Sequence, residues 1–247
     1  MKAFLLEHEI EIDERSLTVG NSWHRREKPD DPLHGRNVVM LEWLLHRFAQ
    51  HEAPVFVDVG AHTGLFTLLA ALVPDLRVYA FEPVFIDVLR ANIALNGLDD
   101  RVTAYGVALG AETGSGVIHV SDSVIGSHST MSEEVPAVFA KYGDYHDETV
   151  PVDTLDEYAD FWSVGPSVMK IDVEGMEKYV VAGGEQTIRE YKPDILVECI
   201  VEHAGRVGYG PRETTRLLNS WGYMCQVKGN DAACIHGGAK GKIWETE

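Results

Sequence analysis

The stretch that decides the fold runs from Val55 to Gly64 and reads VFVDVGAHTG. Apart from Asp58, its first five residues are apolar, as in a strand that is buried on both faces of a parallel sheet. The glycine-containing turn leads into the apolar residues 65–73, which predict a helix with Thr63 as its N-cap and Pro74 at its end. The opening unit is therefore strand, loop, helix.

The same order repeats along the chain. Further strands are predicted at residues 77–81, 102–107, 168–173 and 194–200, and further helices at residues 37–51, 84–95, 179–191 and 214–221. Strands that alternate with helices imply right-handed crossovers and a parallel sheet. Residues 223–227 and 232–236 predict a closing hairpin. The expected fold class is α/β: a doubly wound, mostly parallel, Rossmann-like sheet with a C-terminal antiparallel hairpin.

A length of 247 residues suits one large domain with a substantial core. We expect residues 1–50 to form an N-terminal extension that packs on the core. It consists of a hairpin over residues 5–19, with its turn at residues 13–16, and of a helix. Residues 51–247 form the main domain. The stretch from about residue 114 to residue 166 breaks the alternation and is expected to be an insertion beside the functional site.

The composition argues against some classes of partner. Apolar residues make up 45% and charged residues 24%, which is typical of a globular protein. A formal net charge of -18 repels a phosphate backbone, and the short basic cluster at residues 24–28 is followed by Asp30 and Asp31. We therefore expect a small-molecule partner and no nucleic acid.

Cysteine content and apolar runs bear on the compartment. The three cysteines form no CxxC pair, and their odd number does not suggest a disulfide framework. The longest apolar run, residues 65–73, is far shorter than the ~20 residues that a bilayer requires, and the N-terminus lacks the pattern of a signal peptide. The sequence therefore predicts a cytoplasmic protein with no membrane partner, and leaves a homodimer open.

The turn after the first strand carries the main chemical signal. Gly60 and Gly64 let the backbone approach a ligand, but their spacing departs from the GxGxxG pattern of dinucleotide-binding proteins. Asp58 stands two residues before the first glycine, where a carboxylate suits an α-ammonium group. Glu82 ends the second strand, where an acidic side chain can accept hydrogen bonds from ribose hydroxyls. The pattern favours a cofactor that carries an amino acid and a nucleoside.

Four stretches resemble the FkbM family of methyltransferases: FVDVGAHTG (56–64), AFEP (80–83), NIALNG (92–97) and KIDVEGME (170–177). The last is the most specific, and the resemblance covers roughly residues 55–200. It implies S-adenosylmethionine as the methyl donor and S-adenosylhomocysteine as the product. It also implies a hydroxyl oxygen as the acceptor, which we expect on a small natural product or sugar.

The resemblance assigns expected donor-binding residues: Asp58, Gly60, His62, Thr63, Gly64, Glu82, Pro83, Val107, Ala108 and Asp172. Asp58 and the glycines would cradle the amino-acid part of the donor. Glu82 would bind the ribose, and Val107 and Ala108 would face the adenine. His62 would contact the ligand through its backbone.

Methyl transfer is an in-line displacement, so the protein mainly aligns acceptor and methyl group and excludes water. A hydroxyl acceptor also gains from a general base. The expected catalytic residues are Asp172 and Glu174 first and then His203, and Glu198 belongs to the same strand-end region. The eleven histidines show no HxxxH or HxH spacing, so no metal is expected.

Other interpretations stay open at this point. The acceptor could be a carboxylate or an amine, because acceptor contacts fall in the least regular stretches. A non-catalytic nucleotide-binding module would keep the donor residues without turnover, and the absent GxGxxG pattern weakens a nicotinamide dehydrogenase. Asp58 could cap a turn, and Glu174 could serve only a hydrogen-bond network around Gly175.

Overall fold

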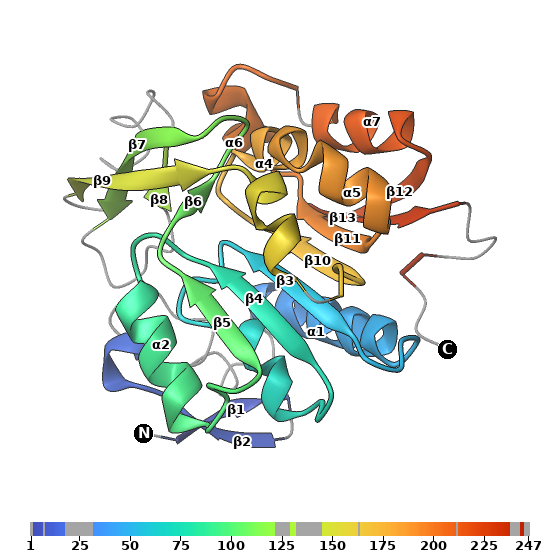
Figure 1. Cartoon of the computed structure of the whole chain (residues 1–247). Helices are drawn as coiled ribbons and strands as arrows, with labels where there is room; N and C mark the ends of the chain where they lie inside the picture. Colours follow the sequence, from blue (N-terminus) through green and yellow to red (C-terminus); the bar gives the residue numbers. More distant parts are fainter. Residues whose placement is uncertain are drawn as a thin grey trace.

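A computed structural model describes residues 2–6, 8–17, 32–121, 129–131, 145–162, 164–210, 212–237 and 243–244. At its centre is a seven-stranded sheet in the order β12-β13-β11-β10-β3-β4-β5 (Figure 1). Its strands are β3 (Val55–Val59), β4 (Arg77–Phe81), β5 (Val102–Tyr105), β10 (Val168–Ile171), β11 (Asp194–Glu198), β12 (Tyr223–Lys228) and β13 (Asp231–His236). The five strands from β11 to β5 are parallel, and β13 is antiparallel to both neighbours. The predicted fold class, including the C-terminal hairpin, is confirmed.

Helices cover both faces of this sheet (Figure 1). They are α1 (Pro32–Phe48), α2 (Ile86–Leu95), α4 (Glu177–Gly183), α5 (Glu185–Tyr191), α6 (Val201–Arg206), α7 (Glu213–Ser220) and the 3₁₀ helices η3 (Thr67–Ala71) and η4 (Leu155–Phe161). Successive strand residues point to opposite faces. Phe56 therefore packs in the core that includes α1 and η3, whereas Val57 and Val59 pack in the core that includes η4, α4 and α5. An apolar strand buried on both faces is the physical reason for this layered arrangement.

The strand order creates a topological switch point between β3 and β10. From β3 the chain continues to β4 and β5, whereas from β10 it continues in the opposite direction to β11. Ligands of open α/β sheets bind outside the carboxyl ends of the strands at such a point. A functional site is therefore expected at the residues that follow β3 and β10.

The helix predicted at residues 65–73 is shorter in the structure. It is the 3₁₀ helix η3, which Phe66 precedes, so the predicted N-cap at Thr63 is wrong. Gly64 has a φ of 101°, so the turn after β3 is still being completed at this residue. The turn uses residues that the apolar pattern assigns to the helix.

The helix predicted at residues 179–191 is divided at Gly184 into α4 and α5. A Cβ atom at Gly183 would lie 1.9 Å from the carbonyl oxygen of Gly110, and one at Gly184 would lie 2.6 Å from Leu155 Cδ2. The two glycines therefore let the helix layer approach the chain after β5 and the helix η4 closely. Glycine at these positions also weakens the helix, which is consistent with the break.

The insertion contains a second, four-stranded sheet in the order β6-β9-β7-β8. Its strands are β6 (Ala108–Leu109), β7 (Gly114–Ser121), β8 (Ser129–Thr130) and β9 (Tyr145–Asp153). The expected start at about residue 114 is too late, because β6 pairs in parallel with β9 and belongs to this sheet. Since β6 closely follows the carboxyl end of β5, the small sheet stands at the carboxyl edge of the central sheet (Figure 1).

The N-terminal hairpin lies earlier than predicted, so the turn expected at residues 13–16 is wrong. The observed elements are β1 (Lys2–Leu5), β2 (His8–Glu11) and the 3₁₀ helix η1 (Glu14–Leu17). Asn92 of α2 and Asn96, which directly follows α2, hold this segment. Asn92 Oδ1 accepts the Asp13 N–H at 2.6 Å, and Asn96 Oδ1 accepts the Glu11 N–H at 3.0 Å. The NIALNG stretch therefore docks the N-terminal segment on α2.

The closing hairpin contains a disulfide between Cys225 and Cys234, which the cysteine pattern did not anticipate. The two residues face each other in the register of β12 and β13, so their side chains leave the hairpin on the same side. Cys199 is the free cysteine, and burial raises the pKa of its thiol to about 12. The pairing follows from hairpin register, and the cytoplasmic location inferred from cysteine content stays a prediction.

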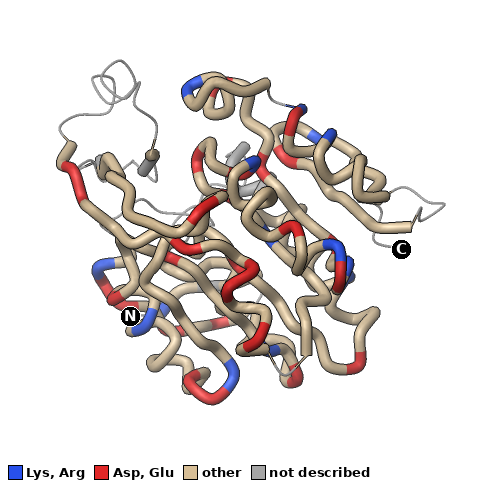
Figure 2. Tube along the Cα trace, turned by 45° about the horizontal axis from the view of Figure 1, so that its top comes forward, with Lys and Arg blue, Asp and Glu red and all other residues tan. Residues whose placement is uncertain are grey.

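Acidic residues are distributed over many loops and helices of the described chain (Figure 2). The formal net charge of -18 is therefore spread over many parts of the chain and is not concentrated in one segment. Among the described residues, no helix combines the length and the apolar character that crossing a membrane requires.

Candidate active site

The turn after β3 packs against the end of β10. Gly60 has a φ of 76°, and a Cβ atom there would lie 2.0 Å from the carbonyl oxygen of Asp172. Gly64 has a φ of 101°, and a Cβ atom there would lie 2.8 Å from Leu89 Cδ1. Gly60 is therefore required by its backbone conformation and by the close approach of Asp172, and Gly64 by its backbone conformation, whether or not a ligand is bound.

Glu82, which directly follows β4, is bonded to the same turn. Its Oε2 accepts the N–H of His62 at 2.9 Å, and its Oε1 accepts the N–H groups of Val84 at 2.9 Å and Phe85 at 3.0 Å. Burial raises the pKa of Glu82, and these three N–H groups oppose the shift. The carboxylate thus fixes the turn after β3 relative to the loop after β4.

Four other predicted donor residues lie around this turn or after β5. Thr63 is buried, and its carbonyl accepts a side-chain N–H of Asn92 at 2.7 Å. Pro83 is half-buried in the loop after β4. Val107 lies between β5 and β6, and Ala108 packs in the apolar core of the small sheet. Their contacts with a donor stay predictions.

Asp58 lies inside the protein, with a relative exposure of 0%. Its Oδ2 accepts the Thr67 hydroxyl at 2.7 Å, and its Oδ1 lies 3.6 Å from Lys170 Nζ. Burial raises the pKa of Asp58, while the charge of Lys170 opposes the shift. The same Nζ lies 3.4 Å from Asp172 Oδ2, and the Asp172 side chain is 24% exposed. Of these two carboxylates, Asp172 is therefore the one nearer to solvent.

A second charged group lies at the ends of β10 and β11. It contains Glu174, which follows β10 with a φ of 55°, Glu198, which ends β11, and His203 of α6. His203 Nδ1 lies 3.2 Å from Oε2 of Glu174 and 3.2 Å from Oε2 of Glu198. Burial raises the pKa of Glu174 well above its usual range, and the charge of Glu198 raises it further. Two of the three expected catalytic residues, Glu174 and His203, are therefore in contact.

These three side chains also form a donor set that could hold a metal ion, because their ligand atoms lie within 4.8 Å of one another. Histidine spacing could not reveal this set, since Glu174, Glu198 and His203 come from three separate elements. The imidazole already contacts both carboxylates. The imidazole is thus an alternative to a metal ion as the partner of both carboxylates.

Sequence reasoning missed Glu177 and Lys170. Glu177 Oε1 accepts the N–H groups of Val173 at 3.1 Å and Gly175 at 3.0 Å, and its Oε2 accepts the Tyr209 hydroxyl at 3.1 Å. Burial raises the pKa of Glu177 to about 7. Lys170 carried a detectable signal, because a charged residue inside the otherwise apolar β10 needs a compensating partner.

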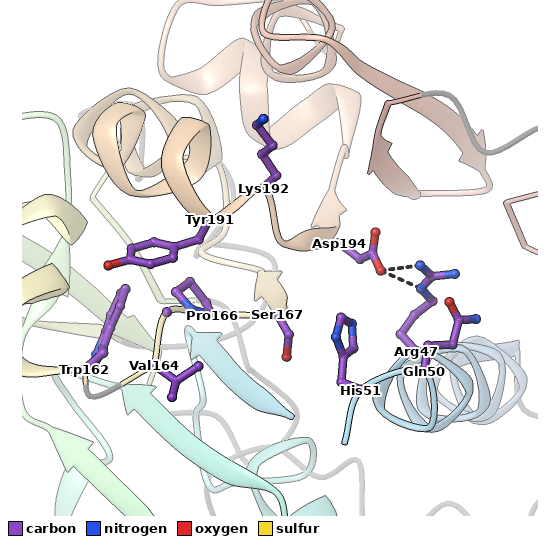
Figure 3. Close-up of a pocket in the computed structure, with 11 residues that line it drawn as sticks. Arg47, Gln50, His51, Trp162, Val164, Pro166, Ser167, Tyr191, Lys192 and Asp194 are labelled. Atoms are coloured by element: carbon purple, nitrogen blue, oxygen red, sulfur yellow. Dashed lines mark hydrogen bonds and ion pairs between the residues drawn. The ribbon is translucent and has the colours of Figure 1, made fainter. Parts of the chain in front are cut away.

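A cavity of about 600 Å³ lies at the opposite edge of the sheet. Ser167, which directly precedes β10, and Asp194, which begins β11, place it at the amino ends of the strands. Figure 3 shows Arg47 bonded to Asp194 on one side of the cavity and the rings of Trp162 and Tyr191 on the other. This cavity is therefore separate from the charged groups at the carboxyl ends.

Comparison with known proteins agrees with this geometry. The family model of the methyltransferase FkbM domain matches residues 58–225, which is more than half of the chain. Methyltransferase sdnD of Sordaria araneosa is 29% identical over 170 residues, covering 59% of this chain and 66% of that protein. The ribosomal protein L11 methyltransferase of Carboxydothermus hydrogenoformans is 34% identical over 64 residues, covering 24% of this chain and 21% of that protein. The chain thus spans less than two thirds of the length of either relative.

Among solved structures, a methyltransferase FkbM from Methylobacillus flagellatus has a TM-score of 0.50 and 18% sequence identity. The match covers 74% of this chain and 44% of that chain. At this identity the structural likeness shows the fold alone. The assignment rests on the family model, which covers both the turn after β3 and the charged strand ends. The chain belongs to the FkbM family of methyltransferases.

Proposed function

We propose that the chain is an S-adenosylmethionine-dependent O-methyltransferase that acts on a hydroxyl group of a small natural product or sugar. The observation that carries the proposal is the contact of His203 with Glu174 and Glu198. Glu174 follows Asp172 by only two residues, and the carbonyl of Asp172 packs on Gly60. A hydroxyl acceptor must lose its proton, and this group supplies a base beside the expected donor turn.

The residues around β3 and β4 fit a bound donor. A carboxylate has about four lone-pair positions, and three backbone N–H groups fill three of those on Glu82, so a ribose hydroxyl has an acceptor position. The partly exposed Asp172 offers a negative charge for the α-ammonium group. Bound S-adenosylmethionine would supply the methyl group from a sulfonium centre. The contribution of the chain is then to orient both reactants and exclude water.

His203 is the general base in this proposal. Glu198 holds Nδ1 at 3.2 Å, which leaves Nε2 as the nitrogen that can take the acceptor proton. Glu174, at the same distance from Nδ1, stabilises the imidazolium that forms. Asp172, which sequence reasoning ranked first, is paired with the ammonium of Lys170. We therefore assign Asp172 to the donor.

The acceptor in this proposal is a small molecule, because the charge of -18 opposes binding of a nucleic acid. The small sheet at the carboxyl edge stands where it can shape the acceptor pocket.

Calorimetry with S-adenosylmethionine, S-adenosylhomocysteine and NAD tests the donor assignment. We expect a Kd on the order of micromolar for the first two, which corresponds to roughly 8 kcal/mol of binding free energy. Glu82→Ala should abolish this binding, whereas Glu112→Ala, at an exposed position away from the turn, serves as the matched control. Preference for NAD would contradict the proposal.

Methyl release in an acceptor panel tests the chemistry. Hydroxylated small molecules should yield S-adenosylhomocysteine, while amines and carboxylates of similar shape should not. Donor binding without turnover on any hydroxyl compound would instead indicate a non-catalytic module.

A further inference from the structure

Lys170 is a buried lysine at the centre of the sheet. It lies in β10, whose four residues are all buried, and its own exposure is 3%. An ammonium group removed from water needs charged or hydrogen-bonding partners to remain in place. The residues that surround its Nζ atom therefore define what this lysine does.

The partners of Lys170 come from both strands at the switch point. The register pairs Lys170 with Asp58 on β3, and Asp172 follows two residues later on β10. Because side chains alternate along a strand, all three point to the same face. Nζ lies 3.6 Å from Asp58 Oδ1, 3.4 Å from Asp172 Oδ2 and 3.5 Å from the carbonyl oxygen of Gly60. It also lies 4.8 Å from the centre of the Phe66 ring.

The charge balance of this group is uneven. One ammonium is shared by two carboxylates, so the three side chains carry one excess negative charge when all are ionised. Asp58 is wholly enclosed, whereas the Asp172 side chain is 24% exposed. The excess negative charge therefore lies nearest to solvent at Asp172, where it would attract a cation. Without Lys170, two neighbouring carboxylates in a buried site would repel each other and one would take up a proton.

We propose that Lys170 is a positioning residue for the donor site: it keeps Asp58 and Asp172 ionised together and fixes Asp172 where the cationic amino-acid part of the donor binds. This inference rests on the proposed function as far as the donor is concerned. Through its contact with the Gly60 carbonyl, Lys170 also links the turn after β3 to the end of β10. One ammonium group thus holds Asp58, Asp172 and the turn at Gly60 together. Lys170 itself need not touch the donor.

The test uses Lys170→Met, which replaces the lysine with a long, unbranched side chain that carries no charge. Arg47→Met is the matched control, because it breaks the partly buried Arg47–Asp194 ion pair at the opposite edge of the same sheet. We expect both variants to lower the melting temperature. Calorimetry should show S-adenosylmethionine binding weakened roughly 10- to 100-fold in Lys170→Met alone, as for loss of a charged hydrogen-bonding partner. Equal affinity in Lys170→Met and wild type would overturn the proposal.

A second measurement needs no donor. In Lys170→Met the folded chain should hold a proton on the carboxylate pair more tightly than the unfolded chain does, so stability should fall as pH rises above the ordinary aspartate pKa of about 4. This decline should be steeper than in wild type, and Asp58→Asn in the Lys170→Met background should remove the added slope. Parallel pH profiles for wild type and Lys170→Met would contradict the charge coupling. If wild type fails to bind the donor, the proposed function fails, while this profile still tests Lys170.

Discussion

The two charged groups at the carboxyl edge balance their carboxylates differently. On the donor side, Asp58 and Asp172 share the ammonium of Lys170, which stays charged at neutral pH. On the proposed acceptor side, Glu174 and Glu198 share the imidazole of His203, which carries a charge only in its protonated form. The difference fits the roles that we propose, a fixed charge in the first group and proton transfer in the second.

The largest expected effect comes from replacing His203, the proposed general base. His203→Gln should reduce turnover by about 10²- to 10⁴-fold, the usual contribution of a general base, and leave donor affinity unchanged. Single-turnover methyl transfer with calorimetry on the same sample separates the two quantities. Glu198→Gln should lose less, because it orients His203 without taking the proton. Full activity in His203→Gln would place the base elsewhere.

The next effect concerns the backbone of the donor side. Gly60→Ala should destabilise the fold by about 2–4 kcal/mol, because its Cβ atom would lie 2.0 Å from the Asp172 carbonyl oxygen at a φ of 76°. Gly97→Ala is the control: φ is 63°, but no described atom lies within 4 Å of the added carbon. It should cost only about 1 kcal/mol. Urea unfolding measures both, and equal losses would show that backbone strain alone, without crowding, decides the effect.

A smaller effect concerns Glu177 and the pH dependence of stability. Burial raises the pKa of Glu177 to about 7 from 4.5, so the folded chain binds this proton more tightly than the unfolded chain. The stability that this proton contributes is present at low pH and lost as pH rises from about 4.5 through 7. Glu177→Gln stays neutral and should therefore gain about 1–3 kcal/mol on wild type between pH 5 and 8. Denaturant unfolding across this range measures the gain; the exposed Glu112→Gln should show none.

The smallest expected effect concerns metal ions. If His203 and not a metal ion is the partner of Glu174 and Glu198, treatment with EDTA should change turnover by less than about twofold, and added Mg²⁺, Mn²⁺ or Zn²⁺ should not raise it. Loss of activity in EDTA that one of these ions restores would instead show that the same three side chains bind a metal.

Local pattern made much of the donor side predictable. The strand at Val55–Val59 was visible because burial on both faces leaves an apolar run, and the strand at Arg77–Phe81 was predicted with the observed bounds. Gly60 was visible because a turn that leaves a strand and packs closely needs glycine. These signals depend on residues within a few positions of one another. Helix length was less predictable, since Gly64 and Gly184 act through tertiary packing.

The sequence by itself determined the α/β alternation and the family motifs, because hydrophobic period and turn chemistry are local properties. Only the tertiary structure decided which charges meet. Lys170 reaches Asp58 because β10 lies beside β3, and His203 reaches Glu174 and Glu198 because α6 returns over the ends of β10 and β11. The contacts of Lys170 with Asp58 and of His203 with Glu174 depend on strand order and register, which join residues far apart in the chain, so no spacing within the sequence records them.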